Sequence, residues 1–164
     1  MKTLFLLRHA KSSWKDSDLQ DFDRPLNGRG KKASEIIGRF IRKKKLTPDL
    51  LLSSPANRAR ETIETIIKIA NLPSELRFDE RIYEAGALRL LEIVSEIEDE
   101  RSTVILVGHN PGMEELLRLL TDHVEHMATG TLAKIDLQAA SWSKALEGKG
   151  SLDWIVKPKE LAEG

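Results

Sequence analysis

The sequence of 164 residues contains no cysteine. This absence excludes disulfide bridges, catalysis by a thiolate and zinc sites built on cysteine. An excess of charge of one sign is also missing, because 26 Lys and Arg balance 26 Asp and Glu. A generic binder of nucleic acid or of an anionic membrane would carry a basic excess, so we expect neither partner. The opening apolar run, Leu4–Leu7, is too short for a signal peptide or a membrane span, and we expect a cytoplasmic protein.

The residues that are present are typical of a soluble globular protein. Hydrophobic residues make up 40% of the chain and charged residues 32%. The length fits one domain, and no repeat, low-complexity tract or linker divides the chain. We therefore expect a single domain over residues 1–164. A domain of this size buries roughly 68–70% of the surface of its unfolded chain, so its core needs no covalent or metal staple.

Short apolar strands alternate with amphipathic helices along the chain. The expected strands are Thr3–Leu7, Leu50–Leu52 and Val104–Val107, followed by two weaker ones near Leu132–Leu137 and Asp153–Val156. A polar stretch without a period, Lys11–Gly28, is expected to be a loop. The pattern predicts an α/β fold of three layers, α/β/α, with a mainly parallel sheet, helices on both faces and antiparallel pairing of the last two strands.

Apolar residues at helical spacing predict four helices. One begins near Arg29 and ends in the cations Arg42–Lys45, and another follows Ala87 as far as Ile97. Two more are expected to begin at Ser54-Pro55 and Asn110-Pro111, where Ser or Asn would cap the helix and Pro would take its first position.

Candidate functional residues lie directly after three of the expected strands. The first strand runs into Arg8-His9, the second into Ser53-Ser54, and the third into Gly108-His109. Arg58 lies one turn into the helix that follows the second strand. Because parallel strands end at the same edge of a sheet, we expect two histidines and two arginines to meet in one pocket.

This set of side chains suits a phosphoryl group. Two guanidinium groups supply the positive charge and the paired hydrogen bonds that a phosphate dianion needs, and they stabilise the charge that develops during its transfer. A neutral imidazole nitrogen can attack phosphorus and carry it covalently. Positive neighbours favour that neutral form, and the second histidine can hold the transferring oxygens.

Each of these residues also has a purely structural interpretation when it is taken alone. A histidine at a strand end is commonly a hydrogen-bonded structural residue, and Arg58 could be a solvated cation. It is the pairing of His9 and His109 after two similar strands that favours a functional site. His123 and His126 have the i, i+3 spacing of metal ligands, but two ligands do not make a site, and a solvated stretch is the better interpretation.

Three segments resemble motifs of the histidine phosphatase superfamily, which is also called phosphoglycerate mutase-like. Residues 6–14, with Arg8-His9-Ala10-Lys11, resemble its opening Arg-His signature. Residues 53–62 resemble its Ser-x-x-x-Arg-Ala-x-x-Thr motif, and residues 107–111 resemble the motif of its second catalytic histidine. The short chain, Asp23-Arg24-Pro25-Leu26 and Pro158-Lys159-Glu160-Leu161 resemble the branch of SixA-like phosphohistidine phosphatases.

The resemblance implies a phosphoglycerate mutase-like fold and a role for each matching residue. His9 is expected to be the nucleophile that becomes phosphohistidine, while Arg8, Arg58 and His109 bind the phosphoryl group. Glu80, in a segment like the mutases' Glu-Arg-x-Tyr, is the candidate proton donor, and Glu84 is its rival. Lys15 stands where the mutases usually place Asn. No metal and no cofactor are implied.

The expected function is hydrolysis of a phosphorylated substrate through phospho-His9, with a phosphohistidine-bearing protein as the favoured substrate. The chain lacks the length of the mutases, whose insertions help to enclose a small sugar phosphate, and a more open site suits a protein. Two alternatives stay open: a phosphatase of a small phosphorylated metabolite, and a phosphoprotein-binding module with little catalysis. The sequence does not fix the oligomeric state, or whether Lys11–Gly28 closes over the substrate or Arg24 reaches it.

Overall fold

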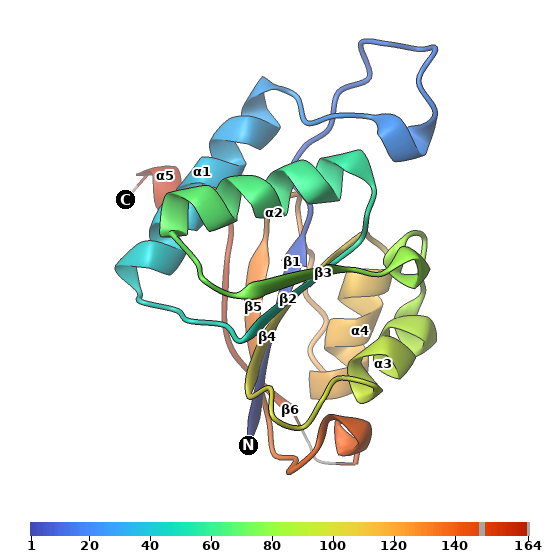
Figure 1. Ribbon diagram of the computed structural model, residues 1–164, viewed down its shortest axis with the longest axis vertical. Coiled ribbons are helices and arrows are strands. Elements are labelled where there is room, and N and C mark those ends of the chain that lie inside the picture. The colour runs from blue at the N-terminus through green and yellow to red at the C-terminus, as the bar shows by residue number, and fades with distance from the viewer. Residues whose placement is uncertain (148–149, 164) are drawn as a thin grey trace.

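A computed structural model of the protein describes residues 1–147 and 150–163 (Figure 1). It contains a six-stranded sheet of β1 (Lys2–Arg8), β2 (Leu50–Ser53), β3 (Glu75–Phe78), β4 (Thr103–Gly108), β5 (Leu132–Leu137) and β6 (Gly150–Val156). The strand order is β3-β2-β4-β1-β5-β6. The first four strands pair in parallel, whereas β5 is antiparallel to both β1 and β6. The mainly parallel sheet and the antiparallel pairing of the last two strands are thus confirmed.

Helices cover both faces of this sheet, which confirms the three-layer arrangement (Figure 1). On one face lie α1 (Gly28–Lys43), α2 (Asn57–Ala70) and the short α5 (Pro158–Glu163). On the other face lie α3 (Ala87–Ser95) and α4 (Gly112–Thr121). Single 3-10 turns are η1 (Asp21–Asp23), η2 (Glu80–Ile82) and η3 (Trp142–Lys144).

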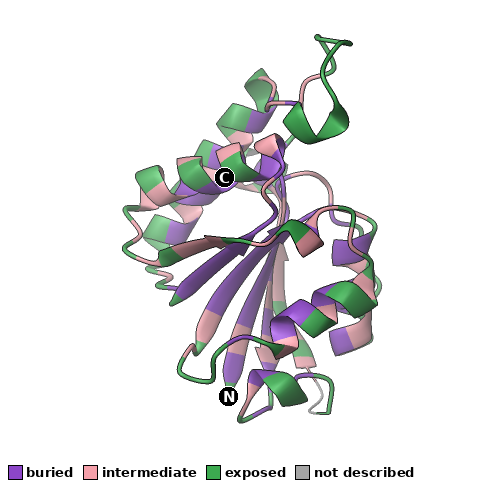
Figure 2. Ribbon diagram, turned by 45° about the vertical axis from the view of Figure 1, so that its right-hand side comes forward, coloured by how far each residue is buried: buried purple, intermediate pink, exposed green. Residues whose placement is uncertain are grey.

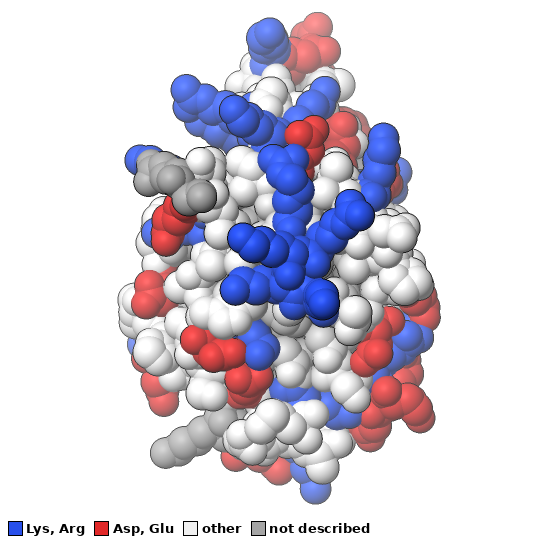
Figure 3. Space-filling view, turned by 90° about the vertical axis from the view of Figure 1, so that its left-hand side faces the viewer, with Lys and Arg blue, Asp and Glu red and all other residues white. Residues whose placement is uncertain are grey.

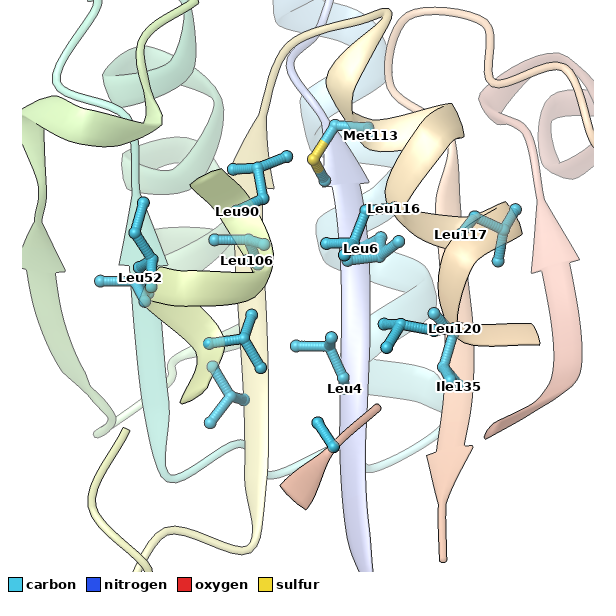
Figure 4. Close-up of a cluster of buried hydrophobic side chains, with 14 of the residues drawn as sticks. Leu4, Leu6, Leu52, Leu90, Leu106, Met113, Leu116, Leu117, Leu120 and Ile135 are labelled. Atoms are coloured by element: carbon cyan, nitrogen blue, oxygen red, sulfur yellow. The ribbon is translucent and has the colours of Figure 1, made fainter. Parts of the chain in front are cut away.

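The alternation of side chains along the strands divides the core into two clusters. In β1, Leu4 and Leu6 pack toward α3 and α4, while Phe5 and Leu7 pack toward α1 and α2. Figure 4 shows the first cluster, in which Leu106 of the neighbouring strand joins them beneath these helices. Figure 2 shows the buried residues concentrated in the sheet and on the inner faces of the helices. Each large side chain buried in this way contributes roughly 1.5–3 kcal/mol of transfer free energy.

The predicted starts of two helices are wrong, by two residues for α2 and by one for α4. α2 begins at Asn57 rather than at Ser54-Pro55, and the Ser54 hydroxyl instead accepts a hydrogen bond from the Ala56 amide at 3.2 Å. α4 begins at Gly112, and the side-chain amide of Asn110 donates to the Met127 carbonyl instead of capping the helix. The Ser54 hydroxyl also bonds the His109 ring at 2.7 Å, so a residue outside the following helix engages each side chain that was expected to cap it.

Two other elements lacked a clear pattern in the sequence. β3 is an edge strand without a buried residue, so it shows no run of apolar side chains. α5 has six residues and too few turns to show a helical period.

The segment with His123 and His126 follows the end of α4 at Thr121, so these histidines do not share a helix face. Among the described helices, none is both long and apolar enough to cross a membrane.

Candidate active site

Two adjacent central strands bring the candidate histidines together. Arg8 of β1 lies opposite Gly108 of β4 in the parallel ladder, so His9 and His109 leave the sheet at the same level. The His9 amide donates to the Gly108 carbonyl at 3.1 Å, which continues the pairing past the strand ends. The two imidazole rings lie 5.0 Å apart between centroids and are tilted by 51°. The structure therefore places both rings over one edge of the sheet, as the strand-end pattern predicted.

The second residue of α2, Arg58, reaches this pair of rings. Its Nε lies 3.4 Å from His9 Nε2 and donates to it. Thr62 fixes the helix against the end of β1, because its hydroxyl donates to the Arg58 carbonyl at 2.6 Å and accepts from the Ala10 amide at 3.0 Å. These two bonds explain why threonine stands one helical turn after Arg58 in the second motif.

The hydrogen bonds of His9 determine which ring nitrogen carries the proton. Its Nδ1 lies 2.7 Å from the Ala10 carbonyl, which can only accept, so Nδ1 is the protonated nitrogen. The neutral ring then keeps its lone pair on Nε2, the atom that faces Arg58. The pKa of His9 is lowered to about 4. Burial is the largest cause, the bond to Ala10 opposes it, and the positive charges of Arg58, Arg8 and Arg24 add to the lowering. At neutral pH the His9 ring is therefore neutral, with an unprotonated Nε2 that can act as a nucleophile.

His109 is held from the neighbouring strand end. Its Nε2 lies 2.7 Å from the Ser54 hydroxyl, directly after β2. The pKa of His109 is lowered to about 3, mainly by burial and also by the charges of His9 and Arg58, while Asp21 opposes the shift. The Tyr83 ring meets the His109 ring edge to face, with centroids 5.5 Å apart. Both histidines are thus neutral over the physiological range.

Arg8 completes the set from the end of β1. Its Nη1 donates to the Met127 carbonyl at 2.9 Å, and the same carbonyl accepts from the Asn110 side chain. Glu114 holds that segment in turn by accepting from the Met127 amide at 2.9 Å. The Arg8 Nη2 makes no hydrogen bond with any residue that the structure describes, so one side of this guanidinium is available to an anion.

Asp21 is a residue of the site that sequence reasoning missed. It lies in η1, in the loop between β1 and α1, and its carboxylate accepts from Arg58 Nη2 at 3.0 Å and from the Tyr83 hydroxyl at 2.6 Å. The Asp21 carbonyl also accepts from Arg58 Nη1 at 2.8 Å. Burial raises the pKa of Asp21, but hydrogen bonds from Tyr83 and Arg24 and the charge of Arg58 outweigh this and lower the pKa to about 2. Nothing in the sequence signalled these contacts, because Asp21 lies in a stretch without a period.

Arg24 anchors the same loop. Its buried guanidinium donates through Nε to the Ser13 carbonyl at 3.1 Å, through Nη1 to Asp21 at 2.8 Å, and through Nη2 to the Ser12 hydroxyl. Its carbon centre also lies 3.2 Å from the centre of the Trp14 ring. All three nitrogens are engaged inside the loop, which favours the anchoring role among the two that the sequence left open for Arg24.

Glu80 and Glu84, the two candidate proton donors, form no hydrogen bond or ion pair with the histidines and arginines of the site among the described residues. The side chains of both are exposed. Arg81, which could have paired with Glu80, instead pairs with Asp79 and Glu96, both at 2.8 Å. Lys15 is exposed in the loop. A proton-donating role for Glu80 stays a prediction.

No metal-binding cluster accompanies these side chains. Within residues 1–147 and 150–163, no three His, Asp or Glu side chains are grouped so that they could hold an ion. His126 Nδ1 lies 3.2 Å from Glu114, and these two residues alone do not complete a coordination shell.

Comparison with known proteins identifies the family. A model of the histidine phosphatase superfamily, branch 1, matches residues 4–90, which is more than half of the chain. The chain belongs to the histidine phosphatase superfamily. The matched part of this superfamily member runs from β1 into α3 and includes Arg8, His9 and Arg58, whereas His109 lies beyond it.

Relatives and solved structures define the branch of the superfamily. An uncharacterised chloroplastic protein of Arabidopsis thaliana is 30% identical over 95% of this chain and 76% of its own length. A protein of Agrobacterium tumefaciens assigned as phosphohistidine phosphatase SixA is 30% identical, with a TM-score of 0.83 over 96% of this chain and 98% of that one. Another such protein, from Nakamurella multipartitia, is 25% identical, with a TM-score of 0.84 over 96% of both chains. This superfamily member therefore has the phosphoglycerate mutase-like fold, lies in the SixA-like branch and is a hydrolase with phosphatase activity.

Proposed function

We propose that this phosphatase hydrolyses phosphohistidine on a protein substrate through a covalent intermediate on His9. The observation that carries the proposal is the 5.0 Å separation of two neutral imidazole rings beside Arg58. A tetrahedral phosphoryl group between the rings would contact His9 Nε2 on one side and His109 on the other. Arg8 and Arg58 would bind its remaining oxygens.

In the first step His9 Nε2 attacks phosphorus and the bond from phosphorus to the leaving nitrogen breaks. The leaving imidazole takes up a proton and departs neutral, and Glu80 is the proposed donor of that proton. The bond from His9 Nδ1 to the Ala10 carbonyl supports this step, because it keeps the lone pair on Nε2 and stabilises the positive charge that the ring acquires. Arg8, Arg58 and His109 stabilise the charge on the equatorial oxygens as the group moves.

In the second step a water molecule attacks the phosphorus of phospho-His9. The bond between phosphorus and Nε2 breaks, its electron pair returns to the ring, and inorganic phosphate leaves with the oxygen of that water. One proton of the water stays on the phosphate, and the other stays there as well or passes to solvent. The enzyme returns to the state in which His9 carries its proton on Nδ1 alone.

Exposed aromatic side chains on the loop that carries Asp21 support a protein rather than a small molecule as the substrate. Trp14 is 76% exposed and Phe22 is 37% exposed, and both belong to the loop that carries Asp21. The Phe22 ring also lies 5.2 Å from that of Tyr83, which borders His109. Figure 2 shows this loop as a largely exposed segment that projects beyond the sheet. Exposed aromatic side chains beside a reactive pocket are typical of surfaces that bind proteins.

The covalent intermediate can be tested with an activated aryl phosphate. The enzyme is mixed with p-nitrophenyl phosphate, quenched and analysed by mass spectrometry for a phosphoryl adduct that is stable in alkali and labile in acid. We expect the adduct on His9 and its loss in His9→Ala. Unchanged turnover in His9→Ala would remove the mechanism, and tight phosphate binding without an adduct would favour a binding module.

The substrate class needs a separate panel. A phosphohistidine-bearing protein, the same protein after denaturation and proteolysis, and small phosphorylated metabolites are compared by kcat/KM. We expect the folded protein to be the best substrate. A small metabolite that is turned over faster than the protein would overturn the substrate class and leave the intermediate on His9 intact.

A further inference from the structure

A groove runs along α1, between this helix and α5, and its α1 side is basic. It has a volume of about 740 Å³, and none of its lining residues belongs to the candidate active site. Its walls and floor are formed by Lys32, Ile36, Arg39, Phe40, Lys43, Lys44, Glu160, Leu161 and Ala162. In Figure 1, α5 lies beside α1 at the outer side of the sheet. We call this feature the α1 groove.

Positive charge is concentrated around the α1 groove, although the whole chain has a formal net charge of zero. Residues 28–45 contain eight of the 26 Lys and Arg but only one of the 26 Asp and Glu, Glu35. Arg39 lies 4.0 Å from Glu35, and it is the only one of these eight cations in an ion pair among the described residues. Figure 3 views this side of the molecule and shows Lys and Arg side chains gathered at its centre. The groove therefore attracts a ligand of negative charge.

The floor of the α1 groove is apolar. Ile36, Phe40 and Leu161 are only partly buried there, and the Phe40 ring meets Trp154 of β6 edge to face at 5.3 Å. The α1 residues of the groove recur at helical spacing from Lys32 to Lys43, so they form one stripe about 16 Å long. An apolar floor bordered by cations on the α1 side, over three helical turns, matches the shape and pattern of an amphipathic helix. On the α5 side the lining carries one charged residue, Glu160, so the carboxylates of such a helix would face α1.

We propose that the α1 groove is a docking site for an acidic amphipathic helix of a partner protein. The apolar stripe of such a helix packs on Ile36, Phe40 and Leu161, and its carboxylates pair with Lys32, Arg39, Lys43 and Lys44. A nucleic-acid backbone has no apolar ridge to fill the floor, and a lipid surface is too flat to enter a groove. The proposal does not depend on the reaction at His9, since the groove and the site share no residue.

Binding is tested with a fluorescein-labelled synthetic peptide of about 14 residues, with Leu along one helix face and Glu elsewhere. Three further probes are measured by the same anisotropy assay or by co-sedimentation: a scrambled peptide of equal composition, a short DNA duplex, and vesicles of phosphatidylglycerol. We expect the patterned peptide to bind at least about tenfold more tightly than the scrambled one, because only the former fills the apolar floor. Equal binding of the two peptides, tighter binding of DNA or vesicles, or no binding of the patterned peptide would overturn the proposal.

Two charge reversals on adjacent residues locate the binding surface. Lys43 lines the groove, whereas Arg42 is exposed on another side of the same helical turn and lines no part of it. We expect Lys43→Glu to weaken binding of the patterned peptide about fivefold and Arg42→Glu to weaken it less than twofold. An equal effect of both reversals would show diffuse attraction rather than docking. Both variants should keep the wild-type rate with p-nitrophenyl phosphate, which shows that they are folded.

Discussion

The carboxylate of Asp21 provides a sharp test of how Arg58 is positioned. Arg58 uses Nη1 and Nη2 for the carbonyl and carboxylate of Asp21, while its Nε faces His9. The two Nη atoms of the guanidinium therefore face the loop, and its Nε faces the nucleophile His9. Because these are different edges, we expect Asp21 to position Arg58 for the phosphoryl group rather than to compete with that group.

The isosteric substitution Asp21→Asn removes the charge and keeps the shape of the side chain. A hydrogen bond to a charged partner contributes about 1.5–3 kcal/mol. The Asp21 side chain is 45% exposed, so solvent screening reduces this to about 1 kcal/mol. One kcal/mol corresponds to a factor of about five, since 1.36 kcal/mol is a factor of ten. We therefore expect kcat/KM for p-nitrophenyl phosphate to fall about fivefold at neutral pH.

The assay measures kcat, KM and the inhibition constant of inorganic phosphate for Asp21→Asn and for a matched control, Asp23→Asn. Asp23 lies in the same 3-10 turn and is exposed, and its carboxylate forms no hydrogen bond with a described residue. We expect weaker inhibition by phosphate in Asp21→Asn and changes below about twofold in Asp23→Asn. Tighter phosphate binding in Asp21→Asn would refute the reasoning, because it would mean that the carboxylate occupies the anion site.

Three further predictions concern the histidines and the core. Because the pKa of His9 is lowered to about 4, its ring should stay neutral as the pH falls below 6.5, and NMR of the imidazole should show a midpoint near 4; a midpoint near 6.5 would contradict this. Ser54→Ala leaves His109 Nε2 without its hydroxyl partner and should lower kcat about tenfold, with recovery in Ser54→Thr; steady-state kinetics on both variants decides. Leu106→Ala opens a cavity at a fully buried position of a central strand and should lower the free energy of unfolding in urea by about 2–5 kcal/mol, whereas Leu88→Ala, at a position 76% exposed, should change it by less than about 0.5 kcal/mol.

The sequence was sufficient to predict five of the six strands and the meeting of four side chains, because both depend on local patterns. Runs such as Leu4–Leu7 and Val104–Val107 identify buried strands, and the residue that follows each run must lie at the edge of a parallel sheet. His9 and His109 are 100 positions apart in the chain, but this separation has no effect on where the two strands end. Strand pairing brings them together.

Local hydrophobic patterns could not predict contacts between distant segments of the chain. The Ser54 side chain bonds His109, and Asn110 bonds Met127, so neither is free to cap the helix that follows it. Asp21 and Tyr83 meet across 62 positions of the chain, and no periodicity marks either of them. β3 was missed because an edge strand with exposed side chains carries no hydrophobic signal.

The direct attachment of both histidines to neighbouring strands determines what kinds of change the pair tolerates. Adjacent strands lie about 4.8 Å apart, close to the 5.0 Å between the two rings, so the gap between them is a dimension of the backbone itself. Lengthening a surface connection elsewhere leaves that dimension untouched. One residue inserted within β4 would turn every later side chain of that strand to the opposite face and carry the His109 ring away from its neighbour.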